Sequence, residues 1–217
     1  SKHSALSFRH FVLGTVAIFI YVGVEVGIPN FANLFMTSPE INIDPTIAGS
    51  VVGTYWFLMM IGRLCGASIG AKVSSRAMLT VVSTVGIVLV LGAIFCADNI
   101  LVNMPVFKSD ISFGFAQVPV NVMLLILCGL CTSVMWGGIF NLAVEGLGKY
   151  TAAASGLFMV MVCGGGILPL IQGGVADFAG FLNSYWVIAL GLAYILFYAA
   201  IGSKNVNTDI PTDDYEA

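Results

Sequence analysis

Long apolar runs alternate with short polar segments along the whole chain. Six runs reach or approach the 20 or so apolar residues that a helix needs to cross a bilayer. Only Glu25 and Arg63 place a charge inside these runs. The pattern predicts an all-α membrane protein in which residues 1–217 form one six-transmembrane-helix bundle. The expected spans are residues 11–35, 47–69, 78–97, 118–144, 151–176 and 185–202.

The segments between the runs contain the residues that favour turns and loops. Residues 37–40 and 72–76 are short and polar, and residues 98–117 form the longest interruption. We expect all three segments to be loops. The acidic stretch 203–217 is too short and too polar for a further span, so we expect it to be a solvated tail.

The positive charges lie mainly in alternate connecting segments, and Lys and Arg next to a span are retained on the cytoplasmic side. One set of segments holds six cations and the other holds Lys108 alone. This bias predicts that both ends of the chain are cytoplasmic. The six cations are Lys2, Arg9, Lys72, Arg76, Lys149 and Lys204.

Composition narrows the possible functions. Apolar residues make up 59% of the chain and charged residues 9%, too few charges to cover a water-soluble domain. A net charge of −3 with scattered cations argues against nucleic acid as a partner. The two histidines, His3 and His10, both lie in the leading segment, so no His-based metal site or catalytic pair is expected in the membrane. We therefore expect no enzyme activity, no metal and no cofactor.

The first span carries a buried acid. Glu25 lies past the middle of the run, Tyr21 stands one helical turn before it, and Pro29 and Asn30 follow. An ionisable group at this depth normally faces a polar pathway or a neighbouring helix. Two interpretations stay open for Glu25: contact with a substrate or proton, and a structural hydrogen bond.

The second span carries Arg63, about nine residues before Lys72. Its long side chain could reach the membrane surface. Alternatively, it could form an ion pair with Glu145 at the end of the fourth span, either as a static contact or as a gate that opens and closes during transport.

Polar and aromatic residues in the fourth and fifth spans suit a sugar. Trp136 can stack on the apolar face of a sugar ring, while Asn141 and Gln172 offer donors and acceptors to hydroxyl groups. Trp136 could also be an interfacial anchor. The candidate substrate-binding residues are therefore Tyr21, Glu25, Asn30, Trp136, Asn141 and Gln172.

Glycines mark two features of the spans. Three at four-residue spacing in the second span, Gly62, Gly66 and Gly70, predict close packing against a neighbouring helix. A second group in the fifth span predicts a kink or hinge. Its members are Gly164, Gly165, Gly166 and Pro169.

Two segments resemble a known family, the fucose permease and bacterial glucose/galactose transporter group of the major facilitator superfamily. They are Tyr21-Val22-Gly23-Val24-Glu25-Val26 and the stretch from Ile139 to Lys149, continued by Ser155-Gly156 and residues 169–173. A weaker match is Gly62-Arg63 after Tyr55-Trp56. A departure is Met135-Trp136-Gly137-Gly138, which leaves the identity of the sugar open.

The resemblance implies spans seven to twelve of a twelve-span transporter, arranged as a 3+3 inverted repeat and forming one half of a major facilitator fold. We expect this chain, which begins at Ser1 without an initiator Met, to be part of a longer protein. Its implied partners are the N-terminal six-span half, a monosaccharide and the lipid bilayer of a bacterial inner membrane. The implied function is sugar transport by proton symport, with the proton as coupling ion. The alternative is a sugar sensor on the same scaffold that does not transport.

Overall fold

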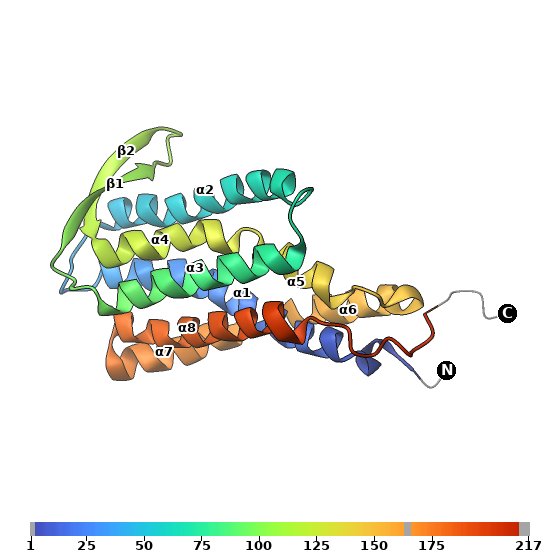
Figure 1. Cartoon of the computed structure of the whole chain (residues 1–217). Coiled ribbons are helices and arrows are strands. Elements are labelled where there is room, and N and C mark those ends of the chain that lie inside the picture. The colour runs from blue at the N-terminus through green and yellow to red at the C-terminus, as the bar shows by residue number, and fades with distance from the viewer. Residues whose placement is uncertain (1–2, 163–165, 213–217) are drawn as a thin grey trace.

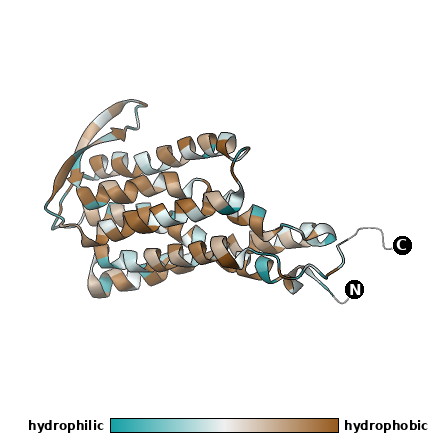
Figure 2. Ribbon diagram, viewed as in Figure 1, coloured by the Kyte–Doolittle hydropathy of each residue, from teal (hydrophilic) through white to brown (hydrophobic). Residues whose placement is uncertain are grey.

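A computed structural model describes residues 3–162 and 166–212 of the chain. Long helices lie side by side in an elongated bundle, with both termini at one end and a β-hairpin at the other (Figure 1). Figure 2 shows apolar residues along the length of these helices and hydrophilic residues mainly at turns and near the termini. The helical bundle confirms the predicted fold class.

Each predicted run coincides with helical structure. Three uninterrupted helices come first: α1 (Arg9–Met36), α2 (Pro45–Ile69) and α3 (Ser75–Phe95). The fourth run divides into α4 (Val120–Thr132) and α5 (Met135–Ala143), and the fifth contains α6 (Thr151–Met161) and α7 (Ile167–Ala179). The last run is α8 (Phe181–Phe197), which continues into a π-helical turn at Tyr198–Gly202. Short 3-10 turns at Ala5–Ser7 and Gly148–Tyr150 precede α1 and α6.

Five segments of the described chain are long and apolar enough to cross a membrane, with α4 and α5 counted together as Val120–Ala143. The shorter apolar helix α7 adds to them. Local signals fix several boundaries. Asp44 accepts a hydrogen bond from the Thr46 amide at 2.8 Å and Pro45 opens α2, while Ser74 caps α3.

The first helix lies at the centre of the bundle. It packs against α2, α4, α5, α6, α7 and α8, and its buried positions include Ala17, Ile18, Val24 and Ile28. The second and third helices each pack against α4. A Cβ atom on Gly62 would overlap Ser133, and one on Gly66 would overlap Val134. The predicted close packing is therefore present at these two glycines.

The expectation that residues 98–117 form a loop is wrong. They contain most of an antiparallel hairpin of β1 (Leu101–Phe107) and β2 (Phe113–Pro119), with Leu101 opposite Pro119 and Phe107 opposite Phe113. Buried and exposed positions alternate along both strands, which is the period of a half-buried sheet. The Phe107 amide donates to Thr54 Oγ1 at 2.9 Å, so the hairpin is attached to α2.

The expectation of a solvated tail also needs correction for residues 203–212. The Thr212 carbonyl accepts a hydrogen bond from the Lys149 amide at 3.0 Å, and Asn207 Oδ1 accepts one from the Arg9 amide at 2.9 Å. These contacts hold this segment against the start of α1 and the turn before α6.

Candidate functional site

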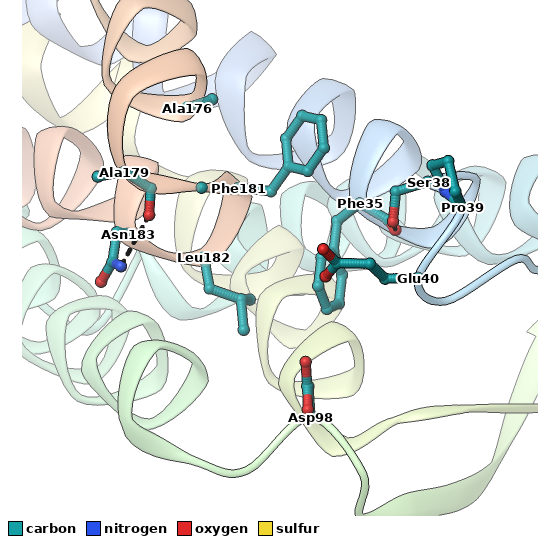
Figure 3. A pocket seen from close by; sticks show the side chains of 11 residues that line it. Phe35, Ser38, Pro39, Glu40, Asp98, Ala176, Ala179, Phe181, Leu182 and Asn183 are labelled. Carbon is teal, nitrogen blue, oxygen red and sulfur yellow. Dashed lines mark hydrogen bonds between the residues drawn. The ribbon is translucent and has the colours of Figure 1, made fainter.

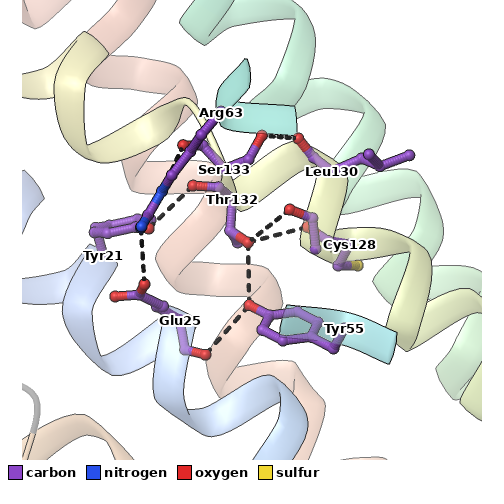
Figure 4. Close-up of polar contacts among 9 residues, drawn as sticks. Tyr21, Glu25, Tyr55, Arg63, Cys128, Leu130, Thr132 and Ser133 are labelled. Atoms are coloured by element: carbon purple, nitrogen blue, oxygen red, sulfur yellow. Dashed lines mark hydrogen bonds and ion pairs between the residues drawn. The ribbon is translucent and has the colours of Figure 1, made fainter. Parts of the chain in front are cut away.

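The two charges inside the apolar runs form an ion pair. Glu25 Oε1 on α1 lies 3.4 Å from Arg63 Nη2 on α2 (Figure 4). The side chain of Glu25 is 19% exposed and that of Arg63 is 55% exposed. Each charge therefore has its partner in this chain, and much of the pair stays accessible on one face of the bundle.

The fourth span is interrupted beside this pair, between Thr132 and Met135. Carbonyl groups at the end of a helix have no partner within it. Here the Thr132 carbonyl accepts a hydrogen bond from the Tyr21 hydroxyl at 3.0 Å, and the Ser133 carbonyl accepts one from Arg63 Nε at 3.4 Å. The interruption thus provides acceptors that hold Tyr21 and Arg63 in place.

Tyr55 completes this network in the interior (Figure 4). Its hydroxyl donates to the Glu25 carbonyl at 3.2 Å and lies 3.0 Å from Thr132 Oγ1. The residue is fully buried. Hydrogen bonds therefore link α1, α2 and α4 at the level of the ion pair. Tyr55 was not among the predicted site residues. The available signal was a tyrosine within an apolar run, which needs a hydrogen-bond partner when it is buried.

An open cavity of about 620 Å³ adjoins Arg63 and brings together two further predicted residues, Trp136 and Asn141. Trp136 is half-buried and stacks on Phe140, with ring centroids 5.5 Å apart and planes inclined by 13°. Asn141 is exposed, and its Nδ2 donates to Ser75 Oγ at 3.4 Å. A cation, an indole and an amide therefore line the same hollow, a combination able to bind a polyhydroxylated ring.

Asn30 lies elsewhere. It is exposed and lines a separate cavity of about 360 Å³ between α1 and α2, together with Pro29 and Trp56. The structure therefore does not place Asn30 beside Trp136 and Asn141.

Tyr21 and Gln172 are fully buried, contrary to their predicted place on the wall of an open path. Gln172 Nε2 donates to Ser184 Oγ at 3.3 Å, and its side-chain oxygen lies against Gly27. The glycine lets α7 approach α1 closely, which encloses the amide between helices. Tyr21 supports the site through its bond to Thr132 and does not line the cavity.

The predicted ion pair between Arg63 and Glu145 is wrong, because Arg63 is paired with Glu25. Glu145 lies just after the end of α5 and is exposed. Its carbonyl lies 2.7 Å from His10 Nε2.

The predicted hinge falls only partly within the described structure. Gly164 and Gly165 lie outside the described residues. Gly166 immediately precedes α7, and Pro169 is the third residue of that helix. An amide at that position has no partner within a helix, so Pro169 removes no helical hydrogen bond. Motion at this point stays a prediction.

A further cavity, of about 410 Å³, lies at the hairpin end of the bundle (Figure 3). Glu40 and Asp98 line it together with Phe35, Leu182 and Asn183. None of the predicted substrate-binding or gating residues takes part in it. We therefore place the candidate site at the Glu25–Arg63 pair and the adjoining cavity.

The sequence of this chain is similar to those of several known proteins. No family model matches the chain. A glucose/galactose transporter of Brucella abortus is 32% identical over 203 residues, covering 93% of this chain and 44% of the relative. A putative glucose/galactose transporter of Helicobacter pylori is 32% identical over 209 residues, covering 94% and 46%. The chain thus spans less than half the length of the curated relatives it matches.

Solved structures show the same fold. A major facilitator superfamily transporter, FucP, in the outward conformation matches with a TM-score of 0.76 at 22% identity, over 91% of this chain and 43% of that one. The L-fucose-proton symporter of Escherichia coli is likewise 22% identical over 197 residues.

The chain therefore has the fold of slightly less than half of the FucP transporter structure. In sequence it is similar to bacterial glucose/galactose transporters and, at lower identity, to the L-fucose-proton symporter, which agrees with the resemblance of its motifs. These relatives are transporters rather than enzymes.

Proposed function

We propose that this chain is the C-terminal half of a monosaccharide transporter that works by alternating access. Its binding wall is the Glu25–Arg63 pair with the adjoining cavity at Trp136 and Asn141. The N-terminal six-span half of the same transporter supplies the opposite wall. The single observation that carries the proposal is an accessible ion pair at the depth of a membrane span.

The chemistry of the pair suits sugar hydroxyl groups. A carboxylate accepts several hydrogen bonds, and a guanidinium has five N–H donors. Arg63 uses Nε for the Ser133 carbonyl and Nη2 for Glu25, so further donors are available to a ligand. Hydrogen bonds to charged groups are stronger than those between neutral groups. A hydroxylated ring can therefore bridge Arg63 and Asn141 while one face stacks on Trp136.

The accessible charge also supports a second half. A charged side chain within the bilayer normally faces protein or a water-filled path. Arg63 is more than half exposed in this chain alone. Another six helices that close over this face would keep Arg63 away from lipid. The relatives are long enough to contain them, because the chain covers 44% of the Brucella protein.

The proposal includes a bacterial inner membrane, both ends of this chain in the cytoplasm, and a proton as coupling ion. The cation-rich segments support the orientation. The similarity to the L-fucose-proton symporter of Escherichia coli supports symport with a proton. We do not assign the proton to Glu25, since its carboxylate already balances Arg63.

Counterflow tests transport. The complete protein encoded by the gene containing this chain is reconstituted in liposomes preloaded with unlabelled D-glucose or D-galactose. We expect labelled sugar outside to accumulate transiently. Binding without counterflow would identify a sugar sensor instead, and neither binding nor counterflow of any monosaccharide would refute the proposed substrate class.

Proton coupling needs its own measurement. Adding sugar to de-energised proteoliposomes in weakly buffered medium should make the external medium more alkaline, because each sugar would enter with a proton. Counterflow without alkalinisation would contradict symport and leave facilitated sugar transport.

A further inference from the structure

A second hollow adjoins the cavity of the candidate site, and the two share Gly66, Val73, Met78, Ser133 and Val134. It is an apolar groove of about 360 Å³ between α2 and α3. Gly62, Cys65 and Ile69 line it from α2, and Ala77 and Val81 line it from α3. Because α2 and α3 each pack on α4, the turn after α4 forms the floor of the groove. The groove therefore runs along two membrane spans.

The floor of the groove offers little to a polar ligand. Ser133 is its polar side chain, and the hydroxyl already donates to the Leu130 carbonyl at 2.6 Å. Val134 provides an apolar surface beside it. A sugar or an ion would find few hydrogen-bonding partners there, whereas an alkyl chain needs none. The occupant of the groove is therefore apolar over its length.

One end of the groove lies next to an exposed cation. Ile69 and Ala77 line that end, and the connection between α2 and α3 carries Lys72, which is exposed. Arg76 on α3 donates through Nε to Ser203 Oγ at 3.2 Å, so its guanidinium is already engaged by the segment after α8. An apolar groove next to an exposed cation matches a molecule with an alkyl chain and an anionic head.

Arg63 lines the sugar cavity and not the groove, and Cys65 lines the groove and not the cavity. The two residues lie two positions apart on α2, which places them about 200° apart around the helix. On the proposed function, on which this step rests, the second half of the transporter covers the Arg63 side. The Cys65 side is left to the bilayer.

We propose that the α2–α3 groove binds an anionic glycerophospholipid from the leaflet on the Lys72 side. One acyl chain lies along Gly62, Cys65 and Val81, and the headgroup phosphate lies at Lys72. From Gly62 to Ile69 the helix rises by roughly 10 Å, which accommodates the part of an acyl chain nearest the headgroup.

Photolabelling tests the site without measuring transport. The complete protein is placed in phosphatidylcholine nanodiscs containing a small fraction of phosphatidylglycerol with a diazirine on one acyl chain, or the matching phosphatidylcholine probe. Adducts are located by peptide mass spectrometry. We expect the phosphatidylglycerol probe to label residues 62–69 and 77–82 about fivefold more than the neutral probe, the effect of about one nearby cation.

Two variants decide the role of charge. Lys72→Gln should reduce groove labelling by phosphatidylglycerol to nearly the level of phosphatidylcholine. Lys108→Gln, which removes a cation from the hairpin at the other end of the bundle, should leave the ratio unchanged. Unlabelled phosphatidylglycerol should compete with the probe, and inorganic phosphate should not.

The unmutated protein gives an independent readout, because raising the salt concentration should reduce the preference for phosphatidylglycerol by screening the cations. Equal labelling by both probes, adducts spread evenly around the bundle, displacement by inorganic phosphate or an unchanged ratio in Lys72→Gln would each overturn the proposal. These outcomes are separate from the counterflow result, so a protein that transports no sugar could still bind the lipid.

Discussion

Replacing Glu25 with Gln tests the candidate site most directly, because the change keeps the shape of the side chain and removes its charge. Two charges 3.4 Å apart attract by about 5 kcal/mol at an effective dielectric constant of 20. Arg63 is 55% exposed, however, and exposed ion pairs contribute only ~0.2–1 kcal/mol to stability. We therefore expect Glu25→Gln to change the free energy of unfolding by less than about 1 kcal/mol. The protein should stay folded, and its binding can be measured.

Binding should respond more strongly than stability. A hydrogen bond to a charged group contributes about 1.5–3 kcal/mol, so its loss should raise the Kd for sugar roughly 10- to 150-fold. Scintillation proximity with labelled D-galactose and D-glucose on the complete protein measures this change. Glu145→Gln is the matched control, since Glu145 is an exposed acid that does not line the cavity. An unchanged Kd for Glu25→Gln, or an equal loss in Glu145→Gln, would show that Glu25 does not contact the sugar.

Two further predictions concern the scaffold. Gly62→Ala should destabilise the protein by about 1–3 kcal/mol because the new methyl group overlaps Ser133. Gly137→Ala is the control, because a methyl group there meets nothing within 4 Å. Equal melting temperatures of the two variants would contradict the close packing at Gly62. Thr54→Val removes the acceptor for the Phe107 amide, so hydrogen exchange at that amide should accelerate about 2- to 13-fold, the equivalent of one hydrogen bond. Exchange as slow as in the unmutated protein would show that this bond does not hold the hairpin.

The helices of the apolar runs could be predicted because a bilayer imposes a minimum length on every run that crosses it. The same signal conceals the interruption after Thr132, since residues 134–140 are as apolar as those before it. A break in the hydrogen-bond ladder leaves no mark on hydropathy when its freed carbonyl groups find partners elsewhere in the fold. Here the partners are Tyr21 and Arg63, which come from other helices.

The hairpin escaped prediction for a related reason. Its buried residues Met104, Val106, Ala116 and Val118 alternate with polar, glycine and exposed aromatic positions. Turn-forming residues lie among them, so the segment has the composition of a loop. The available signal was the alternation of apolar and other residues at every second position. This alternation indicates a hairpin only when the two strands are paired in register.

Which face a polar residue occupies was the least predictable property. Tyr21, Gln172 and Asn141 all lie in apolar runs, yet two are fully buried and one is exposed. The difference depends on which neighbour each helix packs against, and close approaches such as that at Gly27 decide it. Sequence alone identified Glu25 and Arg63 as important but did not pair them, because that pairing depends on how α1 and α2 are placed side by side.

The observed pairing changes what Arg63 can do in a transport cycle. A latch between two halves must break and reform as they move, so its members should lie on different moving parts. Glu25, Arg63 and the Ser133 carbonyl all belong to this chain, where hydrogen bonds also join their helices. Such a network holds the helices together and orients the Glu25 carboxylate. In the proposed transporter Arg63 therefore orients Glu25 and offers its remaining donors to the sugar, and a gating role for Arg63 stays a prediction that needs a partner on the second half.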